Sequence, residues 1–115
     1  MKHTLTLLFD ALMACRSVQR STDGLTFEQY LANEEKQAAV ERWLILIGEA
    51  LNQASVLDPA LPELIPDLRR IVGMRNRLVH GYGVTDPAVV WDVVGLKIPE
   101  LRLILERLLP DDIGR

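Results

Sequence analysis

The chain has 115 residues, a net charge of −3 and one cysteine. Its length fits a single domain over residues 1–115, and its lone Cys15 excludes an internal disulfide, which favours a reducing compartment. The acidic balance argues against broad electrostatic coating of nucleic acid, so any nucleic-acid contact must be local.

The apolar stretches are all short. The longest, such as residues 43–47, fall far short of the roughly 20 residues that a membrane-spanning helix needs. Asp10 and Arg16 interrupt the apolar N-terminal stretch, which also lacks a convincing cleavage site. We therefore expect no signal peptide, no membrane contact and a cytoplasmic location.

Helical periodicity marks the N-terminal half. It predicts a first helix over residues 3–20, with an apolar face of Leu5, Leu8, Phe9, Leu12 and Met13. Thr26 and Gln29 form a capping-box pattern that opens a short helix to about residue 32. Asn33 can cap a long helix from residue 34 to about residue 56. Its expected apolar stripe consists of Ala39, Trp43, Leu46, Ile47, Ala50 and Ala54.

Prolines and glycines delimit the C-terminal half. Pro66 fits the first turn of a fourth helix over about 67–80, which Gly81-Tyr82-Gly83 ends, with a glycine able to take the left-handed cap conformation. Thr85 or Asp86 can cap a last helix, which Pro99 should kink before the helix stops at residue 110. No segment alternates with a period of two. The predicted fold class is therefore all-α, an antiparallel bundle of about five helices.

The fourth helix carries an arginine within an apolar stripe. At about 100° per residue, Arg75 falls on the face of Leu68, Ile71, Val72, Leu78 and Val79. A guanidinium there is costly unless it is paired. Arg75 could pair with an acid of the long helix such as Glu49, reach a subunit boundary, or hold a phosphate.

The residues after Arg75 also allow a structural and a chemical interpretation. His80 lies about 140° further round the helix, so the two side chains converge only if Arg75 curls back or the helix loosens near its end. A histidine there can cap the helix or transfer protons. Tyr82 can be a packed aromatic residue. Three further arginines form either a solvated face or a local RNA-binding patch: Arg69, Arg70 and Arg77.

Taken together, Arg75, His80 and Tyr82 resemble the HEPN ribonuclease motif Arg-x4-His in its longer HepT-like form, Arg-x4-His-x-Tyr. The flanking residues agree, with Gly73-Met74 and Asn76 around the arginine and Val90-Trp91 downstream. Residues 37–42 and 47–50, which include Gly48 and Glu49, resemble the third-helix signature of that family. The resemblance covers nearly the whole chain. One departure is Leu68, where many relatives carry a tryptophan.

The resemblance implies a HEPN four-helix-bundle fold and a homodimer in which the motifs face each other across a cleft. It also implies metal-independent cleavage of RNA without a cofactor. Arg75 would hold the phosphate and His80 would serve as base or acid, with Asn76 and Glu49 in support. Because each protomer has one motif histidine, the dimer would supply a second. The products should end in a 2′,3′-cyclic phosphate.

The resemblance further implies a partner. Such proteins are toxins of a toxin–antitoxin pair, neutralised by a minimal nucleotidyltransferase antitoxin that transfers AMP to the motif tyrosine, here Tyr82. A bulky anionic group two residues from His80 should keep RNA away. Two other functions stay open at the level of the sequence. One is a non-catalytic, nucleotide-binding partner subunit of a nucleotidyltransferase, and the other is a purely structural dimerisation bundle.

Overall fold

A computed structural model describes residues 3–81 and 86–111. Its N-terminal half consists of α1 (Thr4–Thr22), α2 (Phe27–Leu31) and α3 (Glu34–Leu57). The predicted caps are confirmed, since Thr26 and Gln29 form a full capping box and the Asn33 side chain accepts a hydrogen bond from the Lys36 N–H. Sequence and structure therefore agree on how this half is divided into helices.

The C-terminal half begins with α4 (Leu61–Leu64), a single turn that the sequence did not predict. Next come α5 (Leu68–His80), α6 (Pro87–Asp92), the π-helical turn η1 (Val93–Lys97) and α7 (Ile98–Leu108). Pro66 lies before α5, so the prediction that it occupies the first turn of that helix is wrong. The described residues form no strand, and the predicted all-α fold class is confirmed.

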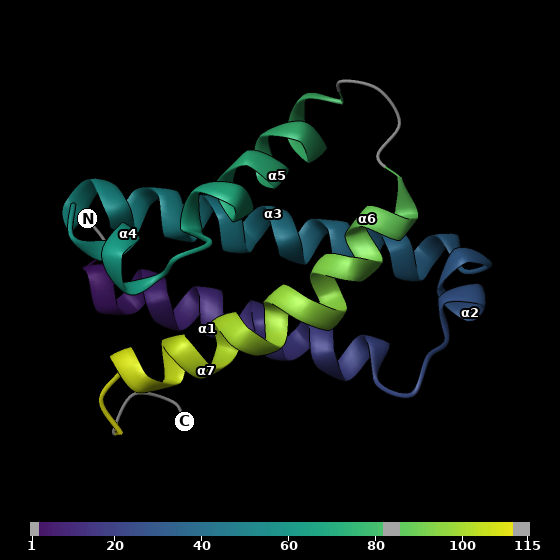
Figure 1. Ribbon diagram of the computed structural model, residues 1–115, viewed down its shortest axis with the longest axis horizontal. Helices are drawn as coiled ribbons and strands as arrows, with labels where there is room; N and C mark the ends of the chain where they lie inside the picture. Colours follow the sequence, from purple (N-terminus) through teal and green to yellow (C-terminus); the bar gives the residue numbers. More distant parts are fainter. Residues whose placement is uncertain (1–2, 82–85, 112–115) are drawn as a thin grey trace.

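The long helices reverse direction one after another (Figure 1). Helix α3 packs between α1 and α5, and α1 also packs against α7. The α6–η1–α7 segment forms one bent rod that crosses α1 diagonally, while α5 leans away from it (Figure 1). At the N-terminal end of the rod, Trp91 of α6 packs on Tyr30 of α2, with ring centroids 4.9 Å apart. Helix α5 is therefore held chiefly by α3, and the rod chiefly by α1 and α2.

The core faces of α1 and α3 differ from those predicted. Leu5 and Met13 of α1 are exposed, and so is Leu46 of α3, while Ala39 and Trp43 are half-buried. Each helix is apolar on more than one face, so periodicity alone does not identify the face that packs. The face of α3 that does pack consists of Val40, Leu44, Ile47, Gly48, Ala50, Leu51 and Ala54.

The predicted irregularity near Pro99 takes the form of the π turn η1. The Ile98 N–H donates to the carbonyl of Val93, five residues earlier, instead of to that of Val94. Proline lacks an N–H, and its ring crowds the carbonyl four residues before it, which here belongs to Gly95. The widened turn relieves that crowding and lets the rod bend around α1. None of the described helices combines the length and the apolar character needed to cross a bilayer.

Two ionisable groups lie in the core without any solvent exposure, the Cys15 thiol and the Tyr30 phenol. Burial raises the pKa of Cys15 from 9.0 to about 12. Burial, aided by the nearby Glu41 carboxylate, raises the pKa of Tyr30 from 10.0 to about 12. Both groups therefore keep their protons in the folded state at pH values where the unfolded chain has lost them.

These pKa shifts predict that the protein loses stability in alkali. Between pH 9 and pH 12 the unfolded chain ionises Cys15 and the folded chain does not, so the free energy of unfolding should fall by up to ~1.4 kcal/mol per pH unit. Below pH 9 the thiol has no such effect. Urea unfolding at a series of pH values should show that Cys15→Ala removes the part of the slope that begins near pH 9. An unchanged slope in that variant would contradict this assignment.

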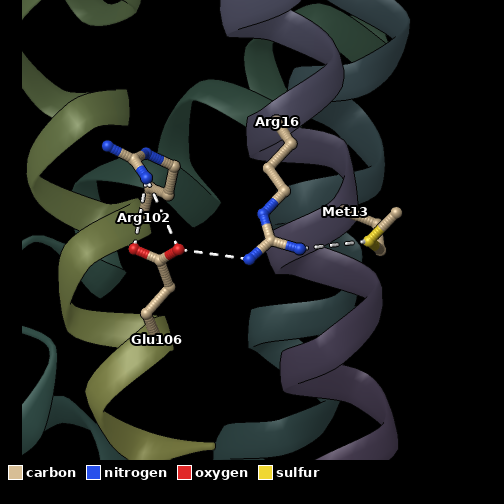
Figure 2. Close-up of polar contacts among 4 residues, drawn as sticks. All are labelled: Met13, Arg16, Arg102 and Glu106. Atoms are coloured by element: carbon tan, nitrogen blue, oxygen red, sulfur yellow. Dashed lines mark hydrogen bonds and ion pairs between the residues drawn. The ribbon is translucent and has the colours of Figure 1, made fainter. Parts of the chain in front are cut away.

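An ion-pair cluster joins α1 to α7 (Figure 2). Arg16 of α1 and Arg102 of α7 both contact the Glu106 carboxylate, at N–O distances of 3.1 Å and 3.2 Å. All three side chains are partly buried, with exposed fractions of 20–32%. The Glu106 carboxylate is therefore shared by two guanidinium groups at this helix contact.

Replacing Glu106 with glutamine should leave both guanidinium groups without their common counter-charge. We expect the free energy of unfolding to fall by about 1–3 kcal/mol, between the values typical of exposed and buried ion pairs. Glu100→Gln, on the exposed surface of the same helix, should stay within about 0.5 kcal/mol of the parent. Urea denaturation followed by circular dichroism measures both. Equal effects of the two substitutions would mean that the cluster adds no stability.

Candidate active site

Helix α5 carries most of the described site residues, and Glu49 lies on the neighbouring helix α3. It is α-helical from Leu68 through His80, and Gly81 follows in the left-handed conformation with φ of 63°. The Gly81 N–H donates to the Arg77 carbonyl, which ends the helix as predicted. The helix does not loosen before His80, so that predicted route to convergence of Arg75 and His80 is wrong. The two residues lie about 140° apart around a regular helix.

Arg75 is partnered by both of the predicted supporting residues. Its Nη2 lies 3.4 Å from Oε1 of Glu49 on α3, and its Nη1 donates to Oδ1 of Asn76 at 2.9 Å. Pairing with Glu49 was one of the alternatives for Arg75, but Glu49 is not buried, since its side chain is 37% exposed. The Arg75 side chain is 28% exposed. Its guanidinium is thus held by two partners, its Nε is buried without a hydrogen-bond partner, and the side chain as a whole stays partly exposed.

Gly48 fixes the depth at which Arg75 lies. A Cβ atom added at Gly48 would overlap the Cβ of Arg75, and it would lie 2.8 Å from its Cγ and 3.4 Å from the carbonyl oxygen of Ile71. The alkyl part of Arg75 therefore rests directly on the backbone of α3. In the sequence, Gly48 stands out only as part of the third-helix signature, which does not predict this contact. An interior helix glycine beside the residue that pairs with Arg75 was the available signal.

Helix geometry sets the order of polar side chains around α5. Viewed down the helix axis, Asn76 lies about 100° round from Arg75, His80 about 140° and Arg77 about 200°. His80 is exposed and lies on the last turn. Tyr82, the predicted modification site, lies outside the described residues. The motif arginine and histidine thus lie about 140° apart around α5, with Asn76 between them in angle.

Two of the three remaining arginines, Arg70 and Arg77, lie about 200–220° round α5 from Arg75. Arg69 lies at about 120°, on the flank of Asn76 and His80 but near the start of the helix. Arg69, Arg70 and Arg77 are all exposed. Gly73 lies beside them, and a Cβ added there would be 3.8 Å from Nη1 of Arg77. The three arginines place positive charge at the surface despite the acidic total of the chain. These three arginines are exposed apart from the Arg75–Glu49 pair, and their predicted role in binding RNA stays a prediction.

A groove of about 380 Å³ lies between α1 and α3, and Glu49 forms part of its wall. Met13 and Leu46 line it and are 42% and 38% exposed. Val79, one turn after Arg75 on α5, is 44% exposed. Exposed apolar side chains thus surround the Arg75–Glu49 pair. Leu46 was predicted to lie in the core, so the sequence did not predict this groove.

The residue types suit the handling of a phosphodiester. A partly exposed guanidinium can donate hydrogen bonds to phosphate oxygens, and an exposed imidazole can accept or donate a proton. Within residues 3–81 and 86–111, no group of three or more His, Cys, Asp or Glu side chains is placed to hold a metal ion.

Residues 11–108 match the family model described as Ribonuclease HepT-like. A Thermococcus cleftensis protein named "Probable ribonuclease HepT" is 33% identical over 105 residues, which cover 88% of this chain and 91% of the relative. A protein of Methanocaldococcus jannaschii, whose name describes it as a "putative RNase", is 28% identical over 110 residues, covering 94% of this chain and 88% of the relative. A similarly named protein of Caldanaerobacter subterraneus is 27% identical over 109 residues, covering 95% and 96%. No solved structure matches the chain significantly.

Proposed function

Because this chain belongs to the Ribonuclease HepT-like family, we propose that it is a metal-independent endoribonuclease and the toxin of a toxin–antitoxin pair. Family membership and the names of the relatives support the ribonuclease activity itself. The observation that supports the proposed mechanism is that Glu49 and Asn76 hold the Arg75 guanidinium in place, five residues before His80 on the same helix. Arg75 would serve as the phosphate ligand, and His80, about 140° further round the same helix, would transfer protons.

In the proposed reaction the substrate supplies its own nucleophile. The ribose 2′-oxygen attacks phosphorus and the bond to the 5′-oxygen breaks, which leaves a 2′,3′-cyclic phosphate and a free 5′-hydroxyl. One group takes the 2′-hydroxyl proton and another gives a proton to the leaving oxygen. His80 serves in one of these roles, and Arg75 balances the charge that builds up on the phosphoryl oxygens.

A homodimer would supply the second histidine. The groove between α1 and α3 supports this part of the proposal, because exposed Met13 and Leu46 line it together with Glu49. Apolar side chains around a site that must take up an anion suit contact with a second copy of the chain. Two copies joined at this groove would bring their Arg75–Glu49 pairs to one shared cleft.

Leu46→Glu should therefore separate the protomers and lower RNA cleavage. A carboxylate in the groove would have to be buried in the interface without a partner. We expect a shift from dimer to monomer in multi-angle light scattering and a loss of most of the cleavage. Leu103→Glu makes the same change on α7, at a residue that is 47% exposed and outside the groove. It should leave both properties unchanged, and a dimeric Leu46→Glu protein would exclude this interface.

The deciding experiment for the nuclease is digestion of RNA by the purified protein in an excess of EDTA. Cleavage should persist, and mass spectrometry of the fragments should find 2′,3′-cyclic phosphate ends. Tight nucleotide binding without any cleavage would favour the alternative, a non-catalytic partner subunit of a nucleotidyltransferase. Cleavage that stops with EDTA would exclude the metal-independent route.

The proposed partner is a minimal nucleotidyltransferase antitoxin. It would transfer AMP from ATP to the Tyr82 hydroxyl and release pyrophosphate. The added phosphate would place negative charge two residues from His80 and repel RNA. Co-expression with such an enzyme should restore growth, and the intact mass of the chain should rise by one AMP group at Tyr82. Growth restored with an unmodified Tyr82 would mean inhibition by docking instead.

A further inference from the structure

A second pocket opens where α5 leans away from the α6–η1–α7 rod. Its volume is about 370 Å³, within the range of small-molecule sites in proteins. Buried side chains from α3, α5 and α7 form its floor, and two valines of the rod line its side. These residues are Leu44, Ile71, Met74, Ile98, Val89 and Val93. The pocket is apolar inside and is distinct from the groove that contains Glu49.

The residues at the rim of this pocket are mostly cationic. Arg69, Arg70 and Arg77 line it from α5, and Lys97 lines it from the rod. Asp67 is the only acid among its lining residues, and its carboxylate is 3.1 Å from Nζ of Lys97. Because Asp67 and Lys97 neutralise each other, the three arginines give the rim a net charge of +3. An apolar floor beneath a cationic rim fits a ligand with a flat apolar body and a phosphate.

The pocket lies next to the proposed catalytic residues. Arg70 and Arg77 are seven residues apart and therefore share one strip of α5. His80 is one turn beyond Arg77, about 4.5 Å further along the axis and about 60° round it. A strand of RNA bound at Arg75 and His80 could continue across the Arg77 strip to the pocket mouth.

We propose that this pocket holds the base of an RNA nucleotide that flanks the cleaved bond, with Arg70 and Arg77 on its phosphates. The assignment rests on the proposed ribonuclease function and adds a substrate subsite to it. Guanidinium planes stack well on unstacked bases, which suits recognition of single-stranded RNA. Contacts to the base and its phosphates lie away from the reacting atoms, so they should affect the binding of longer RNA more than the chemical step.

Photocrosslinking to the wild-type protein tests the location directly. The probe is a short oligouridine with 2′-fluoro groups throughout, which cannot be cleaved, and 4-thiouridine at each position in turn. We expect crosslinked peptides that contain the pocket floor around Met74 and the rod around Val93. Crosslinks confined to other parts of the chain would overturn the proposal, whether or not the protein cleaves RNA.

A matched pair of substitutions tests the same site by affinity. Val89→Glu places a carboxylate at the pocket, at a valine that is 47% exposed, and Val56→Glu makes the same charge change on α3, at a valine that is 75% exposed. In fluorescence anisotropy with the same uncleavable RNA, Val89→Glu should weaken binding about tenfold, or about 1.4 kcal/mol. Val56→Glu should change it less than about twofold.

The two tests separate this proposal from the nuclease itself. Crosslinks in the pocket without cleavage of ordinary RNA would support the subsite and exclude the proposed function. Cleavage of ordinary RNA together with equal binding by Val89→Glu and Val56→Glu would exclude the subsite and leave the nuclease in place. Competition of RNA by an acidic peptide, without crosslinks in the pocket, would assign the pocket to a protein ligand and overturn the proposal.

Discussion

His80→Ala is expected to slow RNA cleavage by about 10²–10⁴-fold, the usual contribution of a positioned acid or base. His80 is exposed at the end of α5, so its removal should leave the fold intact. The measurement is the cleavage rate of a fluorogenic oligoribonucleotide, with thermal unfolding of the same sample as the control for folding. Unchanged cleavage by a folded His80→Ala protein would exclude the proton-transfer role.

Arg75→Ala should lower cleavage by about 10²–10³-fold, the loss seen when one group that stabilises a transition-state oxyanion is removed. Arg75→Lys is the matched variant, because it keeps the charge and loses the planar fork that donates two hydrogen bonds. We expect the lysine to recover only part of the rate. Full recovery would mean that charge alone acts there. Asn76 would then have no role in aligning the guanidinium.

The other large effect is expected at Gly48. Gly48→Val should destabilise the protein by at least about 1–3 kcal/mol, because its side chain meets the alkyl part of Arg75 and the backbone of α5. Any accommodation moves α5 away from α3 and takes Arg75 out of reach of Glu49. We therefore expect cleavage to fall even in the fraction of protein that stays folded. Urea unfolding and the cleavage assay measure the two effects separately.

Gly73→Ala is the control for the effect at Gly48. Gly73 is also an interior helix glycine, but an added Cβ would meet only an ordinary contact, 3.8 Å from Arg77 Nη1. Alanine is the better helix former by up to about 1 kcal/mol, so the free energy of unfolding should rise slightly. If Gly48→Val were no less stable than the parent, the contact of Arg75 with the backbone of α3 would be wrong.

Local signals in the sequence predicted the helices well. The capping box at Thr26, the Asn33 cap and the Gly81 terminator act within a few residues, so they can be seen without knowledge of packing. Asp86 caps α6 as predicted, with its carboxylate accepting from the Ala88 N–H at 2.9 Å. The one-turn helix α4 escaped prediction because a single turn has too little periodicity to detect.

The packing of the helices was harder to predict. Leu46 and Trp43 were assigned to the core, yet Leu46 is exposed in the groove beside Glu49 and Trp43 is only half-buried. Which apolar face of α3 is covered depends on where α1 and α5 lie, and this information is not local. The same holds for Gly48, whose importance depends on the position of Arg75 across the helix contact.

The site residues were found by their pattern, and the structure gives their surroundings. Pairing of Arg75 with Glu49 was predicted as one alternative among three, because a wheel places an arginine on a face without identifying its partner. The apolar pocket behind Arg70 and Arg77 could not be foreseen, since it results from the angle between α5 and the rod. Residue patterns thus identify chemical groups, while cavities depend on how whole helices diverge.

The uneven burial of α5 has a consequence for its motions. All three of its fully buried side chains, Leu68, Ile71 and Met74, lie in the first half of the helix. After Met74 only partly buried and exposed residues follow, up to His80. Arg75 directly follows the last of these buried residues and packs on Gly48 of α3, whereas His80 lies on the last turn, whose backbone hydrogen bonds open at less cost than global unfolding. If RNA or a second copy binds at this end as proposed, we expect the last turn of α5 to open less often, which amide hydrogen exchange would measure.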